Sequence, residues 1–262
     1  MRFVRFLHQE KIYYGILEGD QIQPLAAPPF AGLTPRDRPL PLAAVRLLAP
    51  CEPTKIIALG LNYRDHAAEM RMALPPEPLI FMKPSTSVIG PEAPIILPAQ
   101  SRRVDYEAEL AVVIGRPVRK VPAAAAADYI LGYTCLNDVT ARDLQKKDGQ
   151  FTRSKSFDTF APLGPWIETV LLAPEAVTVE AFVNGEVRQH SHLGNLVFGV
   201  ATLVSFISHI MTMLPGDVIA TGTPAGVGPL QPGDIVEIRL AGIGTLRNPV
   251  VKDEDPGHPG TS

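Results

Sequence analysis

The stretch RRVDYEAELAVVIG, residues 102–115, places three acidic residues in a strand that continues into an apolar run. Asp105, Glu107 and Glu109 alternate with uncharged residues, so in an extended chain their carboxylates point to the same face. The apolar residues 111–114 indicate that the strand enters the core. At short range, like charges repel by several kcal/mol even at an effective dielectric constant of about 20, unless a cation lies between them. We therefore expect Glu107 and Glu109 to bind one cation; the alternative is a solvated edge strand whose charges face water.

A third acidic residue, Asp138, completes a candidate set of metal ligands. It ends the strand LGYTCLND, residues 131–138, directly before a helix, where a ligand can lie at a sheet edge. Helix capping is the other role open to Asp138, although Thr140 could fill it instead. Three carboxylates without clustered Cys or His favour Mg²⁺, Mn²⁺ or Ca²⁺ over zinc. Asp105 lies at the start of its strand, and we expect it to pair with an arginine or to face solvent.

The composition describes a chain of nearly balanced charge, with 27 acidic and 24 basic residues and no basic run. Nucleic-acid binding is therefore not expected, because clustered Lys and Arg are needed to follow a phosphate backbone. Cys51 and Cys135 offer neither a disulfide framework nor a Cys-x-x-Cys metal pattern. No apolar run approaches the roughly 20 residues that span a bilayer, and residues 1–20 carry charges throughout, so we expect neither a signal peptide nor a membrane anchor. We predict a cytoplasmic protein without membrane contact.

Turn signals and short apolar runs predict a mostly β protein with few helices, of the α+β class. We expect residues 1–50 to form a small N-terminal β domain and linker, residues 51–252 the main domain, and residues 253–262 a disordered tail. The 27 prolines favour strands and turns over helices. Apolar residues at helical spacing predict one long helix over residues 199–214, and the Asn-Gly dipeptide at 184–185 predicts a β-hairpin. The pattern fits neither a Rossmann sheet nor a TIM barrel.

Three further segments carry side chains suited to acid–base chemistry or to anion binding. His66 and Glu69 in GLNYRDHAAEM, residues 60–70, share one face of a short helix, and a carboxylate beside an imidazole raises its basicity. An ordinary surface pair is the alternative. Lys155 could neutralise a substrate carboxylate or an enolate, although a solvated lysine has the same signature. The segment IATGTPAGVG, residues 219–228, combines small residues, hydroxyls and free N–H groups, which predicts an anion cradle but not a P-loop.

Six stretches, in order along residues 55–229, resemble the fumarylacetoacetate hydrolase family, and specifically its short bacterial members. They are GLNYRDHAAEM, PLIFMKPSTSVIGP, VDYEAELAVVIG, LGYTCLNDVTARDLQ, SKSFDTFAPLGPW and GDVIATGTPAGVG. The resemblance implies an FAH-type mixed β-sandwich roll, usually dimeric, with a small N-terminal β domain. Within the family, the chain resembles 2-hydroxyhepta-2,4-diene-1,7-dioate isomerases and 5-carboxymethyl-2-oxo-hex-3-ene-1,7-dioate decarboxylases.

The resemblance also implies roles for individual residues of this sequence. Glu107, Glu109 and Asp138 match the ligands of Mg²⁺ (or Mn²⁺). His66 and Glu69 match an acid–base pair on a lid helix that orders over bound substrate. Lys155 matches a lysine that faces the metal-bound oxygens, and Thr223 matches a threonine that holds the substrate carboxylate. Gln145 matches a polar contact beside the metal, and we expect Lys83 to be a further substrate-binding lysine.

Three departures from the family pattern bear on substrate choice. Asn62 stands where true fumarylacetoacetases carry a further acidic ligand, which argues against that particular hydrolase. The loop HSHLGNLVF, residues 190–198, replaces a more usual polar loop, so substrate choice is expected to differ. Ser154 stands where the family pattern has glycine.

The ligand set also predicts the class of reaction. Three carboxylates leave open positions on a metal, which suits a 2-oxo acid that binds through its carboxylate and keto oxygens. Together with this ligand set, the resemblance implies a Mg²⁺-dependent enzyme that acts on 2-oxo or 2-hydroxy-dienoic acids through a metal-stabilised enolate, an isomerase or decarboxylase of aromatic-acid degradation. An acylpyruvate C–C hydrolase or an oxaloacetate decarboxylase is the alternative, and a non-catalytic binding protein of the same fold is a second one. We expect a homodimer with a small-molecule oxo-acid substrate.

Overall fold

The computed structural model describes residues 1–253 and consists mostly of strands, which confirms the predicted mostly β class. Its strands form three sheets of twelve, five and three strands. Of the tail expected to be disordered, only Asp253 is described, and its N–H donates to the carbonyl of Leu97 at 3.1 Å; residues 254–262 lie outside the described residues. Within residues 1–253, none of the helices has the length and apolar character needed to cross a membrane.

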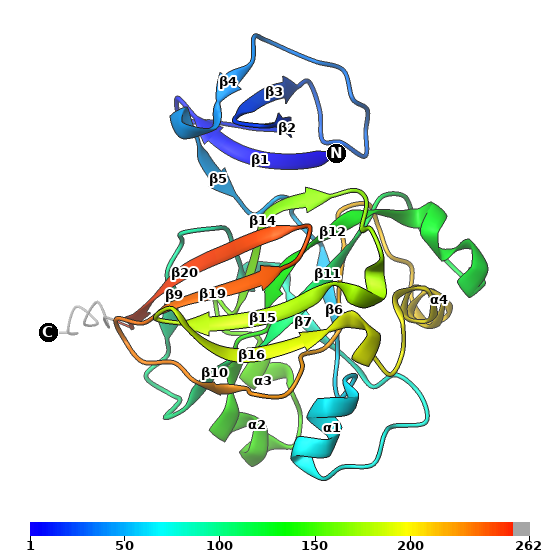
Figure 1. The fold of residues 1–262 in the computed structure, drawn as a ribbon, viewed down its shortest axis with the longest axis vertical. Helices are drawn as coiled ribbons and strands as arrows, with labels where there is room; N and C mark the ends of the chain where they lie inside the picture. The colour runs from blue at the N-terminus through cyan, green and yellow to red at the C-terminus, as the bar shows by residue number, and fades with distance from the viewer. Residues whose placement is uncertain (254–262) are drawn as a thin grey trace, which may run out of the picture.

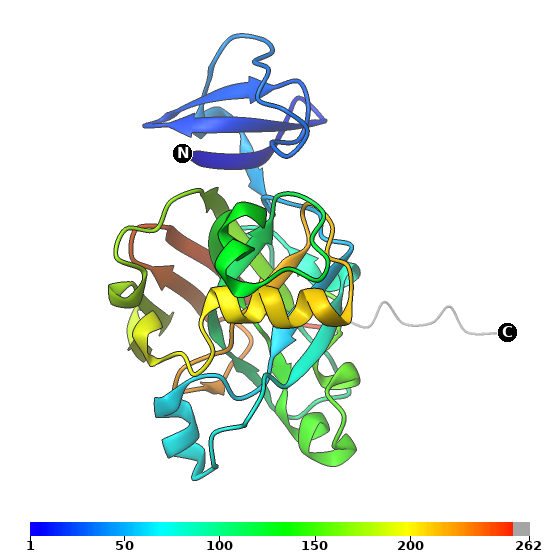
Figure 2. The ribbon, with the colours of Figure 1, turned by 90° about the vertical axis from the view of Figure 1, so that its right-hand side faces the viewer.

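The first strands form a small module, drawn in blue at the top of Figures 1 and 2. Its elements are β1 (Arg2–His8), β2 (Lys11–Glu18), β3 (Gln21–Leu25), β4 (Leu40–Pro41), the short helical turn η1 (Leu42–Ala44) and β5 (Arg46–Leu48). β1, β2 and β3 form an antiparallel meander around a buried core of Val4, Phe6, Leu17 and Ile22. β1 also pairs with β14 (Ala161–Glu168) at its first two residues, which makes the sheet of the module continuous with the main sheet.

The main sheet carries the second half of the acidic stretch near its centre. Its further strands are β6 (Lys55–Leu59), β7 (Ile80–Pro84), β8 (Val88–Ile89), β11 (Ala108–Ile114), β12 (Ile130–Asn137) and β17 (Val218–Ala220). They follow the order β14-β12-β11-β17-β6-β7, so β11 has a neighbour on both sides. Every residue of β11 is buried, as the sequence predicted for residues 111–114.

A five-stranded sheet packs against the main sheet (Figure 1). Its order is β16-β15-β19-β20-β9, formed by β9 (Ile95–Leu97), β15 (Thr178–Val183), β16 (Glu186–His192), β19 (Ile235–Leu240) and β20 (Gly244–Lys252). Val112 and Cys135 of the main sheet share one buried cluster with Val179 and Ile238 of this sheet. The predicted Asn-Gly hairpin is confirmed, because residues 184–185, both at positive φ, connect β15 to β16.

The helical segments are short. They are α1 (Arg64–Met70), α2 (Arg142–Asp148), α3 (Thr152–Lys155) and α4 (Val200–Ile210), with the short helical turns η2 (Ser85–Ser87), η3 (Ala123–Tyr129), η4 (Pro174–Ala176) and η5 (Leu193–Asn195). The helices α1, α2 and α3 lie at the lower end of Figure 1, whereas α4 packs beside η3 (Figure 2). The predicted helix over residues 199–214 is too long, because the chain becomes extended at Met211 and Met213 then bridges to Val118.

The acidic stretch is not one strand, contrary to our expectation. It breaks at Glu107 into β10 (Val104–Tyr106) and β11, and β10 belongs to the three-stranded sheet with β13 (Thr140–Ala141) and β18 (Gly228–Pro229). At the break, the N–H of Glu107 donates to the side-chain oxygen of Asn137 at 2.9 Å, and its carbonyl accepts from the N–H of Asp138 at 2.9 Å. The chain therefore passes from one sheet to another at the first candidate ligand.

Candidate metal and substrate site

Three buried carboxylates meet at the junction of β10, β11 and β12. Glu107 lies at the break between β10 and β11, Glu109 lies in β11, and Asp138 directly follows β12. Ala108 pairs with Asn137 across β11 and β12, which brings the residues on either side of that pair close together. One oxygen of each carboxylate lies within 4.8 Å of the corresponding oxygens of the other two. The structure thus brings together the three residues expected to bind metal.

Glu107 is held by positive charge at both of its carboxylate oxygens. Its Oε2 accepts from Nζ of Lys155 at 2.8 Å, and its Oε1 accepts from the guanidinium of Arg142 and from the hydroxyl of Thr140. Burial by itself would raise the pKa of this carboxyl group, but Lys155 and Arg142 outweigh burial and lower the pKa of Glu107 to about 2. Glu107 is therefore ionised at neutral pH, the state in which it can bind a cation.

Glu109 is in the opposite electrostatic situation. Burial, and after it the negative charges of Asp138 and Glu107, raise the pKa of Glu109 well above its usual value. Its Oε2 accepts from the N–H of Gly222 at 2.8 Å, whereas its buried Oε1 has no hydrogen-bond partner. A cation shared with the other two carboxylates would satisfy this oxygen and remove the repulsion. The all-oxygen donor set therefore fits a hard divalent cation such as Mg²⁺ or Mn²⁺.

Two buried lysines neutralise Asp138. Nζ of Lys83 donates to Oδ1 at 2.5 Å, and Nζ of Lys155 donates to Oδ2 at 2.6 Å. Lys83 comes from β7 and also donates to the carbonyl of Val139 at 3.2 Å. Burial lowers the pKa of Lys83; burial acts in the same direction on Lys155, but Asp138 and Glu107 outweigh it and raise the pKa of Lys155. Both ammonium groups are thus tied to the carboxylate cluster.

A cavity of about 310 Å³ opens beside this cluster. Its polar lining residues include Glu107, Arg142, Gln145, Lys155, His66 and Thr223, and its apolar ones include Met70, Met72, Leu79 and Phe81. A volume of this size fits a small-molecule ligand. Of the residues expected to contact substrate, Gln145 and Thr223 line the cavity, whereas Lys83 does not, because its ammonium group is buried against Asp138.

Helix α1 brings His66 to the wall of the cavity and fastens it there. Nδ1 of His66 lies 3.0 Å from Oε2 of Glu69, as the i, i+3 spacing predicted. Glu69 also accepts from the N–H of Gly226 at 3.1 Å, so α1 is attached to the loop that follows β17. A carboxylate at Nδ1 favours the tautomer in which Nδ1 carries the proton and Nε2 is free to accept one.

Two residues at the site were not predicted from the sequence. Arg142 lines the cavity and donates to Glu107 and, at 2.7 Å, to Oε1 of Gln145; its signal was the i, i+3 spacing with Gln145 in TARDLQ. Gln189 is buried in β16 and donates from Nε2 to the hydroxyl oxygen of Thr223 at 2.8 Å. Because its oxygen already accepts this bond, the hydroxyl of Thr223 can donate to a ligand. No short-range pattern marks Gln189, since it lies 34 residues from Thr223.

The two residues that depart from the family pattern make structural hydrogen bonds. Asn62 is buried, donates from Nδ2 to the carbonyl of Thr221 at 2.8 Å, and accepts at Oδ1 from the N–H of Phe198 at 2.9 Å. It therefore connects the start of α1 to the segments before α4 and after β17. Ser154 is also buried, and its hydroxyl donates to the carbonyl of Phe151 at 2.9 Å within α3.

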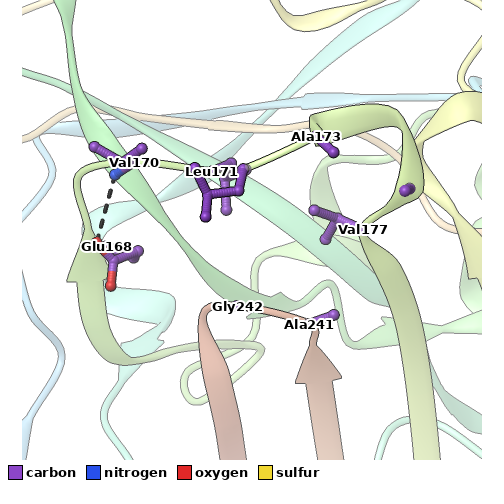
Figure 3. A pocket seen from close by; sticks show the side chains of 9 residues that line it. Glu168, Val170, Leu171, Ala173, Val177, Ala241 and Gly242 are labelled. Atoms are coloured by element: carbon purple, nitrogen blue, oxygen red, sulfur yellow. Dashed lines mark hydrogen bonds between the residues drawn. The ribbon is translucent and has the colours of Figure 1, made fainter.

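A second cavity, of about 430 Å³, lies between the segment after β14 and the turn that joins β19 to β20 (Figure 3). It shares no lining residue with the first, and its wall is mostly apolar, with Val170, Leu171 and Val177. The one charged lining residue, Glu168, already pairs with the N-terminal amine at 3.0 Å and with Nε of Arg2 at 3.2 Å. Its one carboxylate is thus already engaged, and the cavity adds no further charged group.

Comparison with known proteins places this chain in a family. The family model of the fumarylacetoacetate (FAA) hydrolase C-terminal domain matches residues 55–251, and the Rv2993c-like, N-terminal model matches residues 1–50. The chain belongs to the fumarylacetoacetate hydrolase family, which confirms the resemblance seen in the sequence.

Three solved structures are similar to this chain over nearly its whole length. A 5-carboxymethyl-2-hydroxymuconate delta-isomerase from Mycobacterium smegmatis is 50% identical, with a TM-score of 0.91 over 96% of this chain and 100% of that chain. A 2-hydroxyhepta-2,4-diene-1,7-dioate isomerase from Mycobacterium marinum is 46% identical, with a TM-score of 0.89 over 97% of this chain and 99% of the isomerase. A maleylpyruvate hydrolase from Sphingobium sp. SYK-6, in complex with manganese (II) ion and pyruvate, is 32% identical. Its TM-score is 0.80 over 96% of this chain and 99% of the hydrolase. The chain is thus similar to isomerases and to a hydrolase.

Proposed function

We propose that this protein is a divalent-metal-dependent enzyme that acts on 2-oxo or 2-hydroxy-dienoic acids through an enolate, as an isomerase or decarboxylase of aromatic-acid degradation. The observation that carries the proposal is the buried triad of Glu107, Glu109 and Asp138 beside a cavity lined by Lys155 and His66. The two similar isomerases support the reaction type, and the manganese complex of the similar hydrolase supports the metal. We propose Mg²⁺ (or Mn²⁺), because all three ligands are carboxylates.

The balance of charge in the cluster favours an anionic substrate. The cluster contains four carboxylates and four cationic side chains, so its net charge is zero when all eight groups are ionised. The carboxylates are those of Asp105, Glu107, Glu109 and Asp138, and the cationic side chains are those of Lys83, Lys155, Arg103 and Arg142. A divalent cation would add two positive charges to this neutral set. A dicarboxylate, or a 2-oxo acid in its enolate form, would restore neutrality beside these buried carboxylates.

The cationic side chains at the cavity would stabilise negative charge on the substrate. When bound, the metal supplies Lewis acidity, which polarises the oxygens of a 2-oxo acid. Lys155 and Arg142 line the cavity and would place positive charge beside the substrate carboxylate and the enolate oxygen. Both side chains are fixed by Glu107, so they would keep their positions as the charge develops.

The remaining polar residues would orient the substrate and move its proton. Thr223 and Gln145 line the cavity and would hold a substrate carboxylate by hydrogen bonds. His66, with its proton held on Nδ1 by Glu69, would accept or return a proton through Nε2. Return of that proton to a different carbon would give isomerisation. In decarboxylation no carbon-bound proton is removed first: the electron pair of the broken C–C bond would become the enolate as CO₂ leaves, and His66 in its protonated form would deliver one proton to carbon.

A panel of substrates, assayed with and without Mg²⁺, tests the proposal. We expect turnover of 5-carboxymethyl-2-oxo-hex-3-ene-1,7-dioate that requires the added metal, with slower turnover of acylpyruvates and oxaloacetate. Loss of activity after chelation, and recovery on addition of Mg²⁺ or Mn²⁺, is the expected metal response. Turnover that is unaffected by chelation would remove the metal from the proposal.

The second candidate function is hydrolysis of a C–C bond in an acylpyruvate. The similarity to the maleylpyruvate hydrolase, which was solved with pyruvate, favours it. His66 would then activate water for attack on the second carbonyl instead of moving a substrate proton. Exclusive cleavage of acylpyruvates in the same panel would establish this activity in place of the first.

The variant Glu107→Gln separates an enzyme from a non-catalytic binding protein of the same fold. We expect it to abolish turnover and to weaken Mn²⁺ binding about tenfold or more in calorimetry, because a neutral amide is a poorer ligand than a carboxylate. Glu180→Gln is the matched control, since Glu180 pairs with His190 outside the cavity. If activity and metal affinity both survive in Glu107→Gln, the ligand assignment is wrong.

We also propose the organisation and setting of the enzyme. Two family models meet between residues 50 and 55, which supports a small β domain over residues 1–50 and a catalytic domain over residues 51–252. The family resemblance supports a homodimer, which light scattering of the purified protein would test. We further propose a cytoplasmic enzyme, in keeping with the balanced charge of the chain.

A further inference from the structure

A third cavity, of about 330 Å³, lies where the N-terminal module meets the main domain. Arg5 of β1 and Leu48 of β5 line it from the module, and Glu52, Ser85 and Gly90 line it from the segments that follow. The strand β5 runs from the upper sheet to the main body at this junction (Figures 1 and 2). The cavity shares no lining residue with the candidate active site, so it is a separate feature of the molecule.

Arg5 supplies an unsatisfied donor at this cavity. The residue is 8% exposed, and one terminal nitrogen of its guanidinium pairs with Oε1 of Glu52 at 2.6 Å. Its Nε is buried and has no hydrogen-bond partner. Because nearly all buried N–H groups in proteins find an acceptor, an orphaned donor in a side chain that lines a cavity indicates a missing partner.

Glu52 is a weakly held partner that a ligand could displace. Its side chain is 66% exposed, against 10% for Arg5, and its other contact, from the hydroxyl of Tyr14, is long at 3.5 Å. An ion pair with one partner largely in water contributes little to stability, since water competes for the exposed carboxylate. Without Glu52, the guanidinium would present Nε and a terminal nitrogen side by side, the fork geometry that binds carboxylates and phosphates.

We propose that this cavity binds a small anion through a carboxylate or phosphate group, with Arg5 as its main contact. One ligand oxygen would accept from Nε of Arg5, and a second would take the place of Glu52. Ser85 offers a hydroxyl at the wall, and Leu48 offers apolar surface for the rest of the ligand. Cys51, also at the wall, does not oppose the anion, because burial raises the pKa of its thiol to about 12 and keeps it neutral.

Calorimetric titration of the full-length protein with inorganic phosphate, and separately with acetate, tests the site. Glu52→Gln removes the competing carboxylate and keeps Arg5, so we expect it to tighten binding about fivefold or more. Arg5→Met removes the guanidinium, and we expect it to weaken binding about tenfold or more. Neither Arg5 nor Glu52 lines the candidate active-site cavity, so anion binding at that cavity should be the same in the wild type and in both variants. A difference in anion affinity between the three proteins therefore measures binding at the third cavity. The better probe identifies phosphate or carboxylate as the preferred group.

The design remains decisive if Arg5→Met does not fold, as judged by circular dichroism. Arg5→Lys then replaces it, because lysine keeps the positive charge but lacks the Nε donor and the fork, and weaker binding is again expected. Affinities for both anions that are unchanged in Glu52→Gln would overturn the proposal, whatever the Arg5 variants do. Absence of measurable binding of either anion to Glu52→Gln would also overturn it.

Discussion

Asp105, the first acid of the ladder, is buried and paired with two arginines. Its Oδ1 accepts from Nε of Arg103 at 2.8 Å, and its Oδ2 accepts from Nε of Arg142 at 2.9 Å, which confirms the expected pairing with an arginine. Arg142 in turn donates to Glu107 and Gln145. Asp105 thus lies outside the triad of Glu107, Glu109 and Asp138, and its carboxylate instead contacts a guanidinium that lines the cavity.

The variant Asp105→Asn tests this positioning role. An amide cannot neutralise Arg142 and accept from both arginines, so we expect kcat/KM to fall about tenfold, equivalent to about 1.4 kcal/mol of transition-state stabilisation. Arg103→Gln is the control, because Arg103 contacts the same carboxylate but is half exposed and does not line the cavity. Steady-state kinetics that show equal losses in the two variants would contradict a role acting through Arg142.

The variant His66→Ala tests the acid–base pair. We expect turnover to fall about 10²-fold, because loss of a general acid or base typically costs at least this much, while Mn²⁺ affinity stays unchanged. His190→Ala is the matched control, since Nδ1 of His190 also pairs with a glutamate, Glu180, at 2.9 Å but outside the cavity. If His66→Ala lost metal affinity and turnover to the same degree, its proposed role in proton transfer would be wrong.

The sequence predicted some members of the site better than others, for a physical reason. Glu107 and Glu109 could be paired from local spacing alone, because alternate residues of an extended chain share a face. The contact between Lys83 and Asp138 joins residues 55 positions apart and depends on how β7 and β12 are placed in the sheet. Gln189 reaches the site in the same non-local way, so neither position could be derived from a pattern.

At the scale of elements, alternation predicted the acidic strand but not its division into β10 and β11. Alternating residues indicate an extended chain, and the chain is extended on both sides of Glu107. The change of sheet depends on the N–H of Glu107 donating to a side chain, Asn137, instead of a neighbouring strand. That contact joins residues 30 apart, and only the folded chain reveals it.

Helix α1 has a length of seven residues and depends on tertiary contacts for its stability. Oδ2 of Asp65 accepts from the hydroxyl of Ser191 at 2.5 Å and from Nδ2 of Asn195 at 3.3 Å, which attaches the first turn to the end of β16 and to η5. We expect Asp65→Ala to speed amide hydrogen exchange in α1 about tenfold or more and to raise KM, because His66 is then less firmly placed. Glu77→Gln, beyond the end of the helix, is the control, and unchanged exchange in Asp65→Ala would disprove the anchor.

At the scale of the whole molecule, composition and turn signals predicted the mostly β class but not the order of the strands. Proline and glycine mark the ends of strands through local backbone preferences. The order β12-β11-β17-β6 pairs segments that lie far apart in the chain, and β17 pairs in parallel with β6. Such pairing depends on the joint packing of two sheets, which a single sequence does not display.

Asp217 joins two of these distant strands, at the start of β17 and the start of β6. It is buried, and its carboxylate accepts from the N–H of Leu214 at 2.8 Å, from the hydroxyl of Thr54 at 2.7 Å and from Nζ of Lys55 at 2.5 Å. Burial would raise the pKa of Asp217, but these hydrogen bonds outweigh it and lower the pKa below the ordinary value of 3.8. The folded state therefore favours the ionised carboxylate more than the unfolded state does.

This depressed pKa predicts the acid sensitivity of the fold. Because the folded pKa lies below the unfolded one, the stabilisation is fully present above the ordinary value of 3.8 and is lost as pH falls through the folded pKa. We expect Asp217→Asn to lower the unfolding free energy by about 2 kcal/mol at pH 7, and the difference from wild type to shrink below the ordinary pKa. Urea unfolding at pH 7 and at a pH below 3.8 measures this difference in unfolding free energy. Asp158→Asn, at an exposed position, is the control. A difference that stays constant with pH would show that Asp217 stabilises the protein through packing and not through its charge.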